Sequence, residues 1–185
     1  MDCLTIDQAV LKLKNGEIIA YPTEAVFGLG CDPHNIQALQ ALISLKGRTW
    51  HKGFILIAST VEQVLPYLDL RHLPAGKWEK IKAMWPGPYT WVFPTTNAVL
   101  PLIQGDKKSV AVRVTAHPVA KALCDAFNDV LVSTSANSAG APPLKSAVEV
   151  KAWAAKKIGG IVSGEIGNAL RPTAIYDALT DRIYR

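Results

Sequence analysis

The chain has 185 residues and a formal net charge of +5, with 49% apolar and 19% charged residues. This composition excludes an intrinsically disordered chain, in which hydrophobicity is low and charge is high, so we expect one folded domain over residues 1–185. No apolar run reaches the roughly 18 residues that span a bilayer, and residues 1–3 lack the order of a secretion signal, so we expect a cytoplasmic protein.

The first predicted elements are a helix, a strand and a second helix. Thr5 and Gln8 form a capping-box pattern ahead of apolar residues that share one helical face. Residues 17–21 are a β-prone run, and a second helical pattern extends over residues 35–47. Residues 21–32 are therefore predicted to connect a strand to a helix.

The rest of the chain alternates between short apolar runs and helical patterns. Further strands are predicted at residues 54–58, 90–93, 110–114, 130–132, 161–162 and 174–176. Helices are predicted at residues 60–68, 75–84, 118–127 and 146–155. This alternation predicts an α/β or α+β fold with one twisted, mostly mixed sheet, and the continuous apolar runs indicate that helices cover its faces.

Several familiar active-site motifs are missing from the sequence. Gly28 and Gly30 begin a dinucleotide-binding pattern, but Pro33 occupies the position of its third glycine. Neither a P-loop nor a nucleophile elbow is present. The histidines are not paired at helical spacing, and the three cysteines form no C-x-x-C pair, so we expect no dedicated transition-metal site and no disulfide framework.

The first candidate functional segment is the run YPTEAVFGLGCD at residues 21–32. A strand stops at a proline there, and Thr23 and Glu24 are followed by two glycines that let a backbone approach a ligand closely. A plain turn explains the proline and the glycines, but not the Thr-Glu pair. We therefore interpret the segment as part of an active site.

The second candidate is a group of cations at the end of the second helix. Lys46, Arg48 and Lys52 lie close together in sequence and form a clamp for phosphate or carboxylate oxygens. The alternative is a helix end stabilised by basic residues through the helix dipole. The net charge also favours an anionic ligand, whereas the lysine pairs at residues 107–108 and 156–157 are interpreted as solvated surface charge.

The third candidate is the hydroxyl-rich run STSANS at residues 133–138, which follows the predicted strand 130–132. Ser133, Ser135 and Asn137 offer hydrogen bonds to phosphate, ribose or carboxylate groups, although a simple polar turn would also use such residues. Arg113 stands inside an apolar strand pattern, where a buried charge needs a partner, and a bound anion is one candidate.

These segments, in this order, resemble the YrdC/TsaC family of threonylcarbamoyl-adenylate synthases. The resemblance rests on YPTEAVFGLGCD (21–32), LKGR (45–48), WPGPYT (85–90), SVAVRV (109–114), HP (117–118) and STSAN (133–137). It covers nearly the whole chain and matches the short form of the family. It implies a twisted α/β sheet with a concave basic cavity.

The resemblance also implies an activity, that of a nucleotidyltransferase. Such an enzyme converts L-threonine, bicarbonate or CO2, and ATP into threonylcarbamoyl-AMP and pyrophosphate. Other proteins then transfer the threonylcarbamoyl group to an adenosine beside the anticodon of tRNA. Magnesium is expected to accompany ATP on its phosphates, because no carboxylate pair marks a fixed set of protein ligands.

The resemblance assigns roles to individual residues. Lys46 and Arg48 are expected to be catalytic. The residues expected to bind ATP are Lys46, Arg48, Lys52, Ser109, Ser133, Ser135, Asn137 and Arg171, and those expected to bind threonine or its carbamate are Thr23, Arg113 and Ser133. The chain departs from the family pattern at Thr49, where many relatives carry proline, and at residues 172–173 next to Arg171.

Two other functions are compatible with the sequence. A basic concave surface suits double-stranded RNA by shape and phosphate contact, although no known double-strand module is recognisable. A carbamoyl-transfer role of the kind found within larger hydrogenase-maturation proteins is the third possibility, against which the absence of fused domains and zinc-finger cysteines argues.

Overall fold

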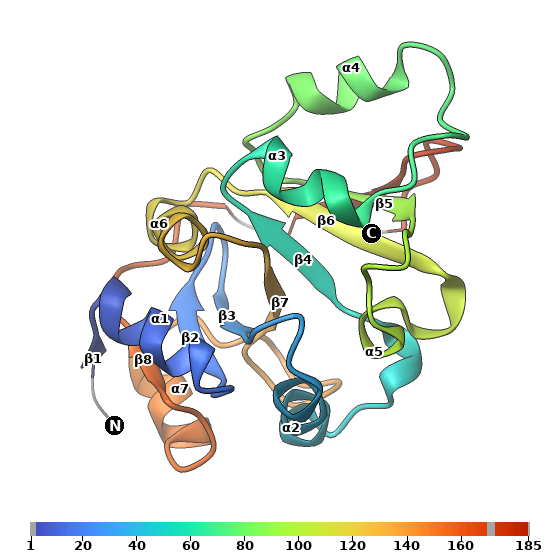
Figure 1. Cartoon of the computed structure of the whole chain (residues 1–185). Coiled ribbons are helices and arrows are strands. Elements are labelled where there is room, and N and C mark those ends of the chain that lie inside the picture. Colours follow the sequence, from blue (N-terminus) through green and yellow to red (C-terminus); the bar gives the residue numbers. More distant parts are fainter. Residues whose placement is uncertain (1–2, 170–172, 185) are drawn as a thin grey trace.

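A mixed β-sheet carries the fold (Figure 1). The computed structural model describes residues 3–169 and 173–184, and within these ranges nine strands form one sheet in the order β1-β8-β2-β3-β7-β4-β6-β5-β9. The strands are β1 (Cys3–Leu4), β2 (Ile19–Pro22), β3 (Phe27–Gly30), β4 (Ile55–Ala58), β5 (Tyr89–Pro94), β6 (Ser109–Val114), β7 (Leu131–Ser135), β8 (Gly160–Val162) and β9 (Ala174–Asp177). The predicted mixed α/β sheet is confirmed.

Strand β7 joins two groups of strands. It pairs antiparallel with β3 on one side and with β4 on the other. The first group, β1-β8-β2-β3, combines two parallel pairs with the antiparallel pair of β2 and β3. The second group, β4-β6-β5-β9, has parallel pairs at β4–β6 and β5–β9 around an antiparallel pair of β5 and β6.

Seven α-helices of the described residues connect these strands. They are α1 (Ile6–Lys14), α2 (Ile36–Lys46), α3 (Val61–Val64), α4 (Lys77–Ala83), α5 (Pro101–Gln104), α6 (Pro118–Phe127) and α7 (Ala147–Ala154). The capping boxes predicted at Thr5 and Ser146 are both formed, and Asn35 caps α2 by accepting a hydrogen bond from the backbone N–H of Ala38. No helix in the described part of the chain is long and apolar enough to cross a membrane.

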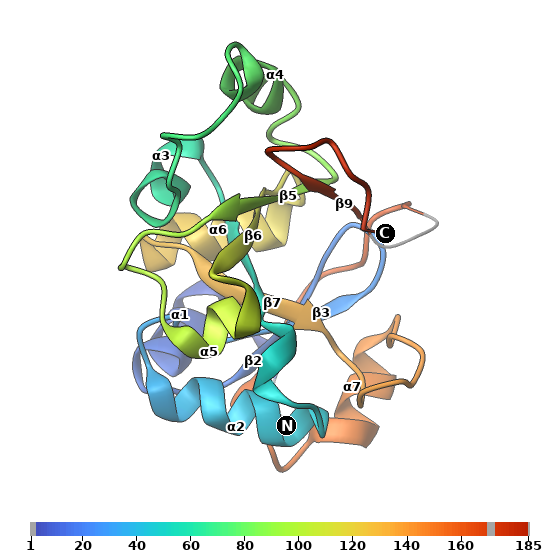
Figure 2. The ribbon, with the colours of Figure 1, turned by 90° about the vertical axis from the view of Figure 1, so that its right-hand side faces the viewer.

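The helices pack on both faces of the sheet, as the apolar strand patterns predict. Alternate residues of a strand face opposite cores: Ile57 packs in the core that contains α1 and α6, whereas Leu56 and Ala58 pack in the core that contains residues of α2, α3 and α7. Figure 2, turned by 90° from Figure 1, shows β9 and the loop between β2 and β3 on the same side of the molecule.

Residues 21–32 do connect strand β2 to helix α2, but the prediction missed a further strand within them. Strand β3 lies within this segment and forms an antiparallel hairpin with β2, in which Tyr21 is in register with Gly28. Glycines are normally depleted in strands, so the run from Phe27 to Gly30 resembles a loop in sequence. Strand β1 and helix α5 are too short to give a periodic signal, and they were not predicted from the sequence either.

Candidate active site

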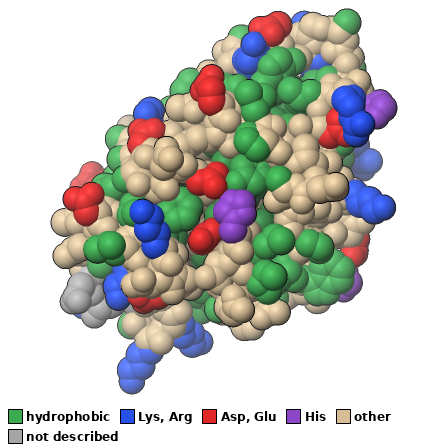
Figure 3. Space-filling view, viewed as in Figure 1, with side chains coloured by type: hydrophobic (Ala, Val, Ile, Leu, Met, Phe, Trp, Pro, Cys, Tyr) green, Lys and Arg blue, Asp and Glu red, His purple; other side chains and the backbone are tan. Residues whose placement is uncertain are grey.

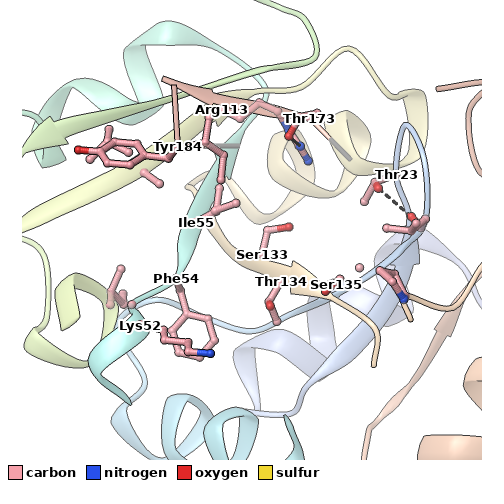
Figure 4. Close-up of a pocket in the computed structure, with 18 of the residues that line it drawn as sticks. Thr23, Lys52, Phe54, Ile55, Arg113, Ser133, Thr134, Ser135, Thr173 and Tyr184 are labelled. Atoms are coloured by element: carbon pink, nitrogen blue, oxygen red, sulfur yellow. Dashed lines mark hydrogen bonds between the residues drawn. The ribbon is translucent and has the colours of Figure 1, made fainter. Parts of the chain in front are cut away.

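A cavity of about 440 Å³ lies on one face of the sheet, a size typical of sites for small molecules (Figure 4). Strand register shows which residues form its floor. Ile55 is in register with Ala111 on one side and with Ser133 on the other, so the three side chains share a face. Helices α1 and α6 pack on another part of that face, against Ile57.

Three of the predicted serines belong to this cavity wall. Ser133 and Ser135 are members of β7 rather than of a loop that follows it, and Ser109 begins β6. Each of the three candidate segments therefore contributes to one cavity, for example through Thr23, Arg48 and Ser133. The cavity lies on the face of the sheet, whereas the sequence predicted a site at the strand ends. The phenol of Tyr21, fully buried, donates a hydrogen bond of 2.9 Å to Ser133 Oγ and fixes that side chain. Burial raises the pKa of Tyr21, which keeps the phenol a neutral donor.

Arg113 is buried at the polar end of the cavity. Its Nη2 lies 3.4 Å from Glu24 Oε2, and its Nη1 donates to Thr173 Oγ1 at 2.9 Å. The sequence predicts a partner for this charge, with a bound anion as one candidate, and in the structure the partner is Glu24. The Nε of Arg113 is buried and has no hydrogen-bond partner among the described residues.

Thr23 stands in the turn of the β2–β3 hairpin. Its hydroxyl donates to the carbonyl of Val26 at 2.7 Å, and its backbone carbonyl accepts from Gly167 at 2.9 Å. The side chain is buried and faces the cavity (Figure 4). Next to it, Glu24 accepts a hydrogen bond of 2.6 Å from Thr115 through its other oxygen, Oε1.

Lys46 organises the segment after β7. Its ammonium donates to the backbone carbonyls of Ser135 at 2.5 Å and Asn137 at 3.0 Å, and to Asn137 Oδ1 at 3.2 Å. Asn137 Oδ1 also accepts from Ser135 Oγ at 2.6 Å. Neither Lys46 nor Asn137 belongs to the cavity wall as the described residues form it, so their contact with phosphate stays a prediction. Burial, with a smaller effect of Arg48, lowers the pKa of Lys46 to about 8.

Arg48 and Lys52 form the wall opposite Arg113 and Thr23. The guanidinium of Arg48 donates to the carbonyl of Gly53 and lies 4.3 Å from the centre of the Phe54 ring, while its Nε is buried without a hydrogen-bond partner. Burial lowers the pKa of Arg48. Lys52 is exposed and lines the cavity from the same loop (Figure 4).

Lys107 and Tyr184 are among the cavity residues that were not identified from the sequence. Lys107 lines the cavity, so its interpretation as plain surface charge is incomplete, and Tyr184 lines it from the C-terminal segment. Lys107 ends the 3-10 turn Gly105–Lys107, which follows the short helix α5. Both elements are too short to give a periodic pattern, so the sequence does not predict where Lys107 lies. Arg171, expected to bind ATP, lies outside the described residues.

The charge of the cavity is positive. Among the described residues of its wall, the cations Arg48, Lys52, Lys107 and Arg113 face one carboxylate, Glu24, which is paired with Arg113. An anionic ligand would offset this positive charge. On the face of the molecule shown in Figure 3, by contrast, basic and acidic side chains are interspersed.

The two glycines of the hairpin have different roles, which a pair of substitutions separates. A Cβ on Gly30 would lie 2.7 Å from Tyr21 Cε1 and 2.9 Å from the Val132 carbonyl, so Gly30→Ala is expected to lower the free energy of unfolding by about 1–3 kcal/mol. A Cβ on Gly28 would meet Thr23 Cγ2 at 3.2 Å and would enter the cavity wall. Gly28→Ala is expected to retain stability and lose ligand affinity. Urea unfolding of both variants tests this, and equal stability losses would contradict it.

Residues 12–185 match the family model described as Sua5_yciO_yrdC, "Telomere recombination". The chain belongs to the Sua5/YciO/YrdC family. This assignment confirms the resemblance that the sequence motifs indicated.

Members of the Sua5/YciO/YrdC family include relatives that are similar over nearly the full chain. A protein of Aliivibrio fischeri named threonylcarbamoyl-AMP synthase is 50% identical over 180 residues, which cover 97% of each chain. The crystal structure of P. abyssi Sua5 complexed with L-threonine superposes with a TM-score of 0.86 at 30% identity, over 93% of this chain and 50% of that chain. E. coli YciO superposes with a TM-score of 0.85 at 25% identity, over 97% of this chain and 87% of that chain.

Proposed function

We propose that this chain is a threonylcarbamoyl-AMP synthase, which forms threonylcarbamoyl-AMP and pyrophosphate from L-threonine, bicarbonate or CO2, and ATP. The observation that supports it best is the cavity whose wall combines the cations Arg48, Lys52, Lys107 and Arg113 with serine hydroxyls. The Aliivibrio fischeri relative of that name, 50% identical over 97% of each chain, supports the same activity.

The reaction brings three anionic groups together, namely the carboxylate of threonine, its carbamate and the triphosphate of ATP. Their mutual repulsion is the main obstacle, and placed cations in a cavity of reduced dielectric offset it. The carbamate oxygen attacks the α-phosphorus, and pyrophosphate leaves with the electron pair of the broken bond. No side chain of the protein needs to act as a nucleophile.

In this proposal, Thr23, Arg113 and Ser133 bind threonine and its carbamate, because all three line the same cavity and offer hydroxyl and cationic groups to a polar anion. Arg48 and Lys52 bind the polyphosphate, and Ser109, Ser135 and Asn137 contribute further hydrogen bonds. Lys46 acts through its bonds to the carbonyls of Ser135 and Asn137, which hold that segment in place. A site that binds the threonine hydroxyl discriminates against analogues without it by up to about ten-thousandfold.

The described residues of the wall do not supply a ligand set for magnesium. The described carboxylate of the cavity, Glu24, is engaged by Thr115 and by Arg113. The described part of the chain also holds no group of three His, Cys, Asp or Glu side chains that is placed to bind a metal ion. Magnesium that accompanies ATP would therefore be held by phosphate oxygens and water.

We further propose that the protein catalyses the first step of threonylcarbamoyladenosine formation in tRNA. It would act in the cytoplasm as a single domain, and tRNA-modifying proteins would use its product. The comparisons favour this activity over the RNA-binding alternative, because the relatives similar over nearly the full chain are named for the synthase. Direct contact with RNA is not required by the proposal.

The test is release of pyrophosphate from ATP by the purified protein, measured with and without L-threonine and bicarbonate. We expect release only when both are present. Release that does not depend on threonine would exclude the proposed reaction, and salt-dependent RNA binding without any ATP turnover would favour the RNA-binding alternative.

A further inference from the structure

The side chain of Tyr21 reaches across a strand to the cavity wall. Tyr21 belongs to β2 and its phenol bonds to Ser133 on β7, although β3 lies between these two strands in the sheet. A Cβ at Gly30 of β3 would lie 2.7 Å from Tyr21 Cε1, and a Cβ at Gly28 would lie 3.4 Å from Tyr21 Cζ. The two glycines of β3 therefore leave the space that the Tyr21 ring occupies.

The hydrogen bond between Tyr21 and Ser133 has one direction. Tyr21 is fully buried and packs in the core that contains α1 and α6, which keeps its hydroxyl from water. Among the described residues, the acceptor for this hydroxyl is Ser133 Oγ. A buried donor that stays unpaired costs free energy, so the phenol donates. Burial also raises the pKa of Tyr21, which keeps the hydrogen on the phenol.

Ser133 is left with one hydrogen to donate. A serine hydroxyl carries one donor hydrogen and two acceptor lone pairs, and the phenol of Tyr21 occupies one of these lone pairs. The hydrogen of Ser133 Oγ therefore points away from the phenol. Ser133 lines the cavity (Figure 4), and the hydrogen bonds of the described residues give its hydrogen no acceptor. This donor is available to a ligand in the cavity.

We propose that Tyr21 is a positioning residue that makes Ser133 a hydrogen-bond donor toward an anionic oxygen of the substrate, an inference that rests on the proposed function. In that function Ser133 binds threonine and its carbamate, and both present negatively charged oxygens. A donor held toward such an oxygen stabilises it, whereas a freely rotating hydroxyl also presents lone pairs that repel it. Tyr21 is not among the described residues of the cavity wall, so its effect passes through Ser133.

A double-mutant cycle on Tyr21 and Ser133 tests this inference. The kcat/KM for L-threonine in pyrophosphate release is measured for the full chain as wild type, Tyr21→Phe, Ser133→Ala and the double variant. We expect Ser133→Ala to lower kcat/KM by roughly 10- to 150-fold, the effect of one hydrogen bond to a charged group. Tyr21→Phe keeps the ring and the Ser133 hydroxyl, so a smaller loss of roughly 5- to 10-fold is expected. In the Ser133→Ala background, Tyr21→Phe should change kcat/KM by no more than about twofold.

Tyr67→Phe is the matched control for the loss of a phenol hydroxyl. The phenol of Tyr67 donates to Asp129 at 2.9 Å, and the residue is buried but is not part of the described cavity wall. Its kcat/KM for L-threonine should equal that of the wild type. A loss that is confined to Tyr21→Phe then cannot come from the removal of a buried phenol hydroxyl as such.

Three results would overturn the inference. An unchanged kcat/KM in Tyr21→Phe excludes a positioning role, and an equal loss for Tyr21→Phe in both backgrounds assigns the phenol to the fold. If Tyr21→Phe does not fold, Ser133→Ala provides the test by itself. Full activity of Ser133→Ala leaves Tyr21 no ligand-binding hydroxyl to orient, whereas a loss of about tenfold or more supports the inference.

The wild type distinguishes failure of this inference from failure of the proposed function. If the wild type releases no pyrophosphate but binds L-threonine, the proposed function fails, and the same cycle is measured as the Kd for L-threonine by isothermal titration calorimetry. A wild type that neither releases pyrophosphate nor binds L-threonine overturns both proposals. An active wild type with additive losses in the cycle overturns the role of Tyr21 and leaves the proposed function intact.

Discussion

Arg48→Ala is expected to lower threonine-dependent pyrophosphate release by roughly a hundredfold or more, the effect of removing one placed donor from a site of charge stabilisation. The variant should remain folded, since the side chain gives up one hydrogen bond to Gly53 and its contact with the Phe54 ring. These losses cost about 1–2 kcal/mol together. The measurement is the initial rate of pyrophosphate release at saturating ATP and threonine.

Two matched variants serve as controls for Arg48→Ala. Arg48→Lys keeps the charge but loses the forked geometry, and we expect a partial loss of activity. Lys151→Ala removes an exposed cation on α7 outside the cavity wall, so its rate should equal that of the wild type. An Arg48→Ala variant that retains full activity would remove this residue from the proposed mechanism.

Removal of Arg113 is expected to damage stability and activity together. The side chains of Arg113 and Glu24 are 8% and 13% exposed, so this ion pair is largely desolvated. Arg113→Met leaves the Glu24 carboxylate buried, with Thr115 as its remaining hydrogen-bond donor among the described residues, and breaking a buried pair in this way costs about 3–5 kcal/mol. Urea unfolding monitored by tryptophan fluorescence measures the loss.

The double variant Glu24→Gln/Arg113→Met separates the two roles of the pair. It removes both charges, so we expect it to recover most of the stability that Arg113→Met loses. It should not recover pyrophosphate release, because the cation proposed to orient the carbamate is still missing. If the double variant is active, Arg113 serves only the fold; if it is as unstable as the single variant, the pair is not the source of the instability.

The sequence predicts most of the fold because local signals agree with the tertiary structure. The capping boxes at Thr5 and Ser146 mark helix starts that the structure confirms, and the strand runs near residues 54–58 and 110–114 form the neighbouring strands β4 and β6. Strand β3 could not be predicted in this way. A Cβ at Gly30 would collide with Tyr21 and with the carbonyl of Val132, so the need for glycine comes from neighbouring strands and leaves no pattern local to β3.

The candidate site is predictable to a similar degree. Residues in compact motifs, such as Arg48 and Ser133, were identified because several polar groups occur together in sequence, and the structure places both in the wall. Lys107 and Tyr184 reach the same wall through the fold alone. Lys107 follows a helix of four residues, and Tyr184 is positioned by hydrogen bonds to Ile175 and Asp177. The contribution of such residues depends on strand order, which the sequence pattern does not encode.

The position of β7 has a consequence for local opening of the molecule. Among the described strands, β7 pairs with both halves of the sheet, and the cavity crosses this junction from Thr23 beside β3 to Tyr184 beside β9. A ligand that contacts both ends therefore ties together two units that could otherwise separate in a partial unfolding event. Bound substrate should slow amide hydrogen exchange in both halves at once, by an amount that follows its saturation of the native state.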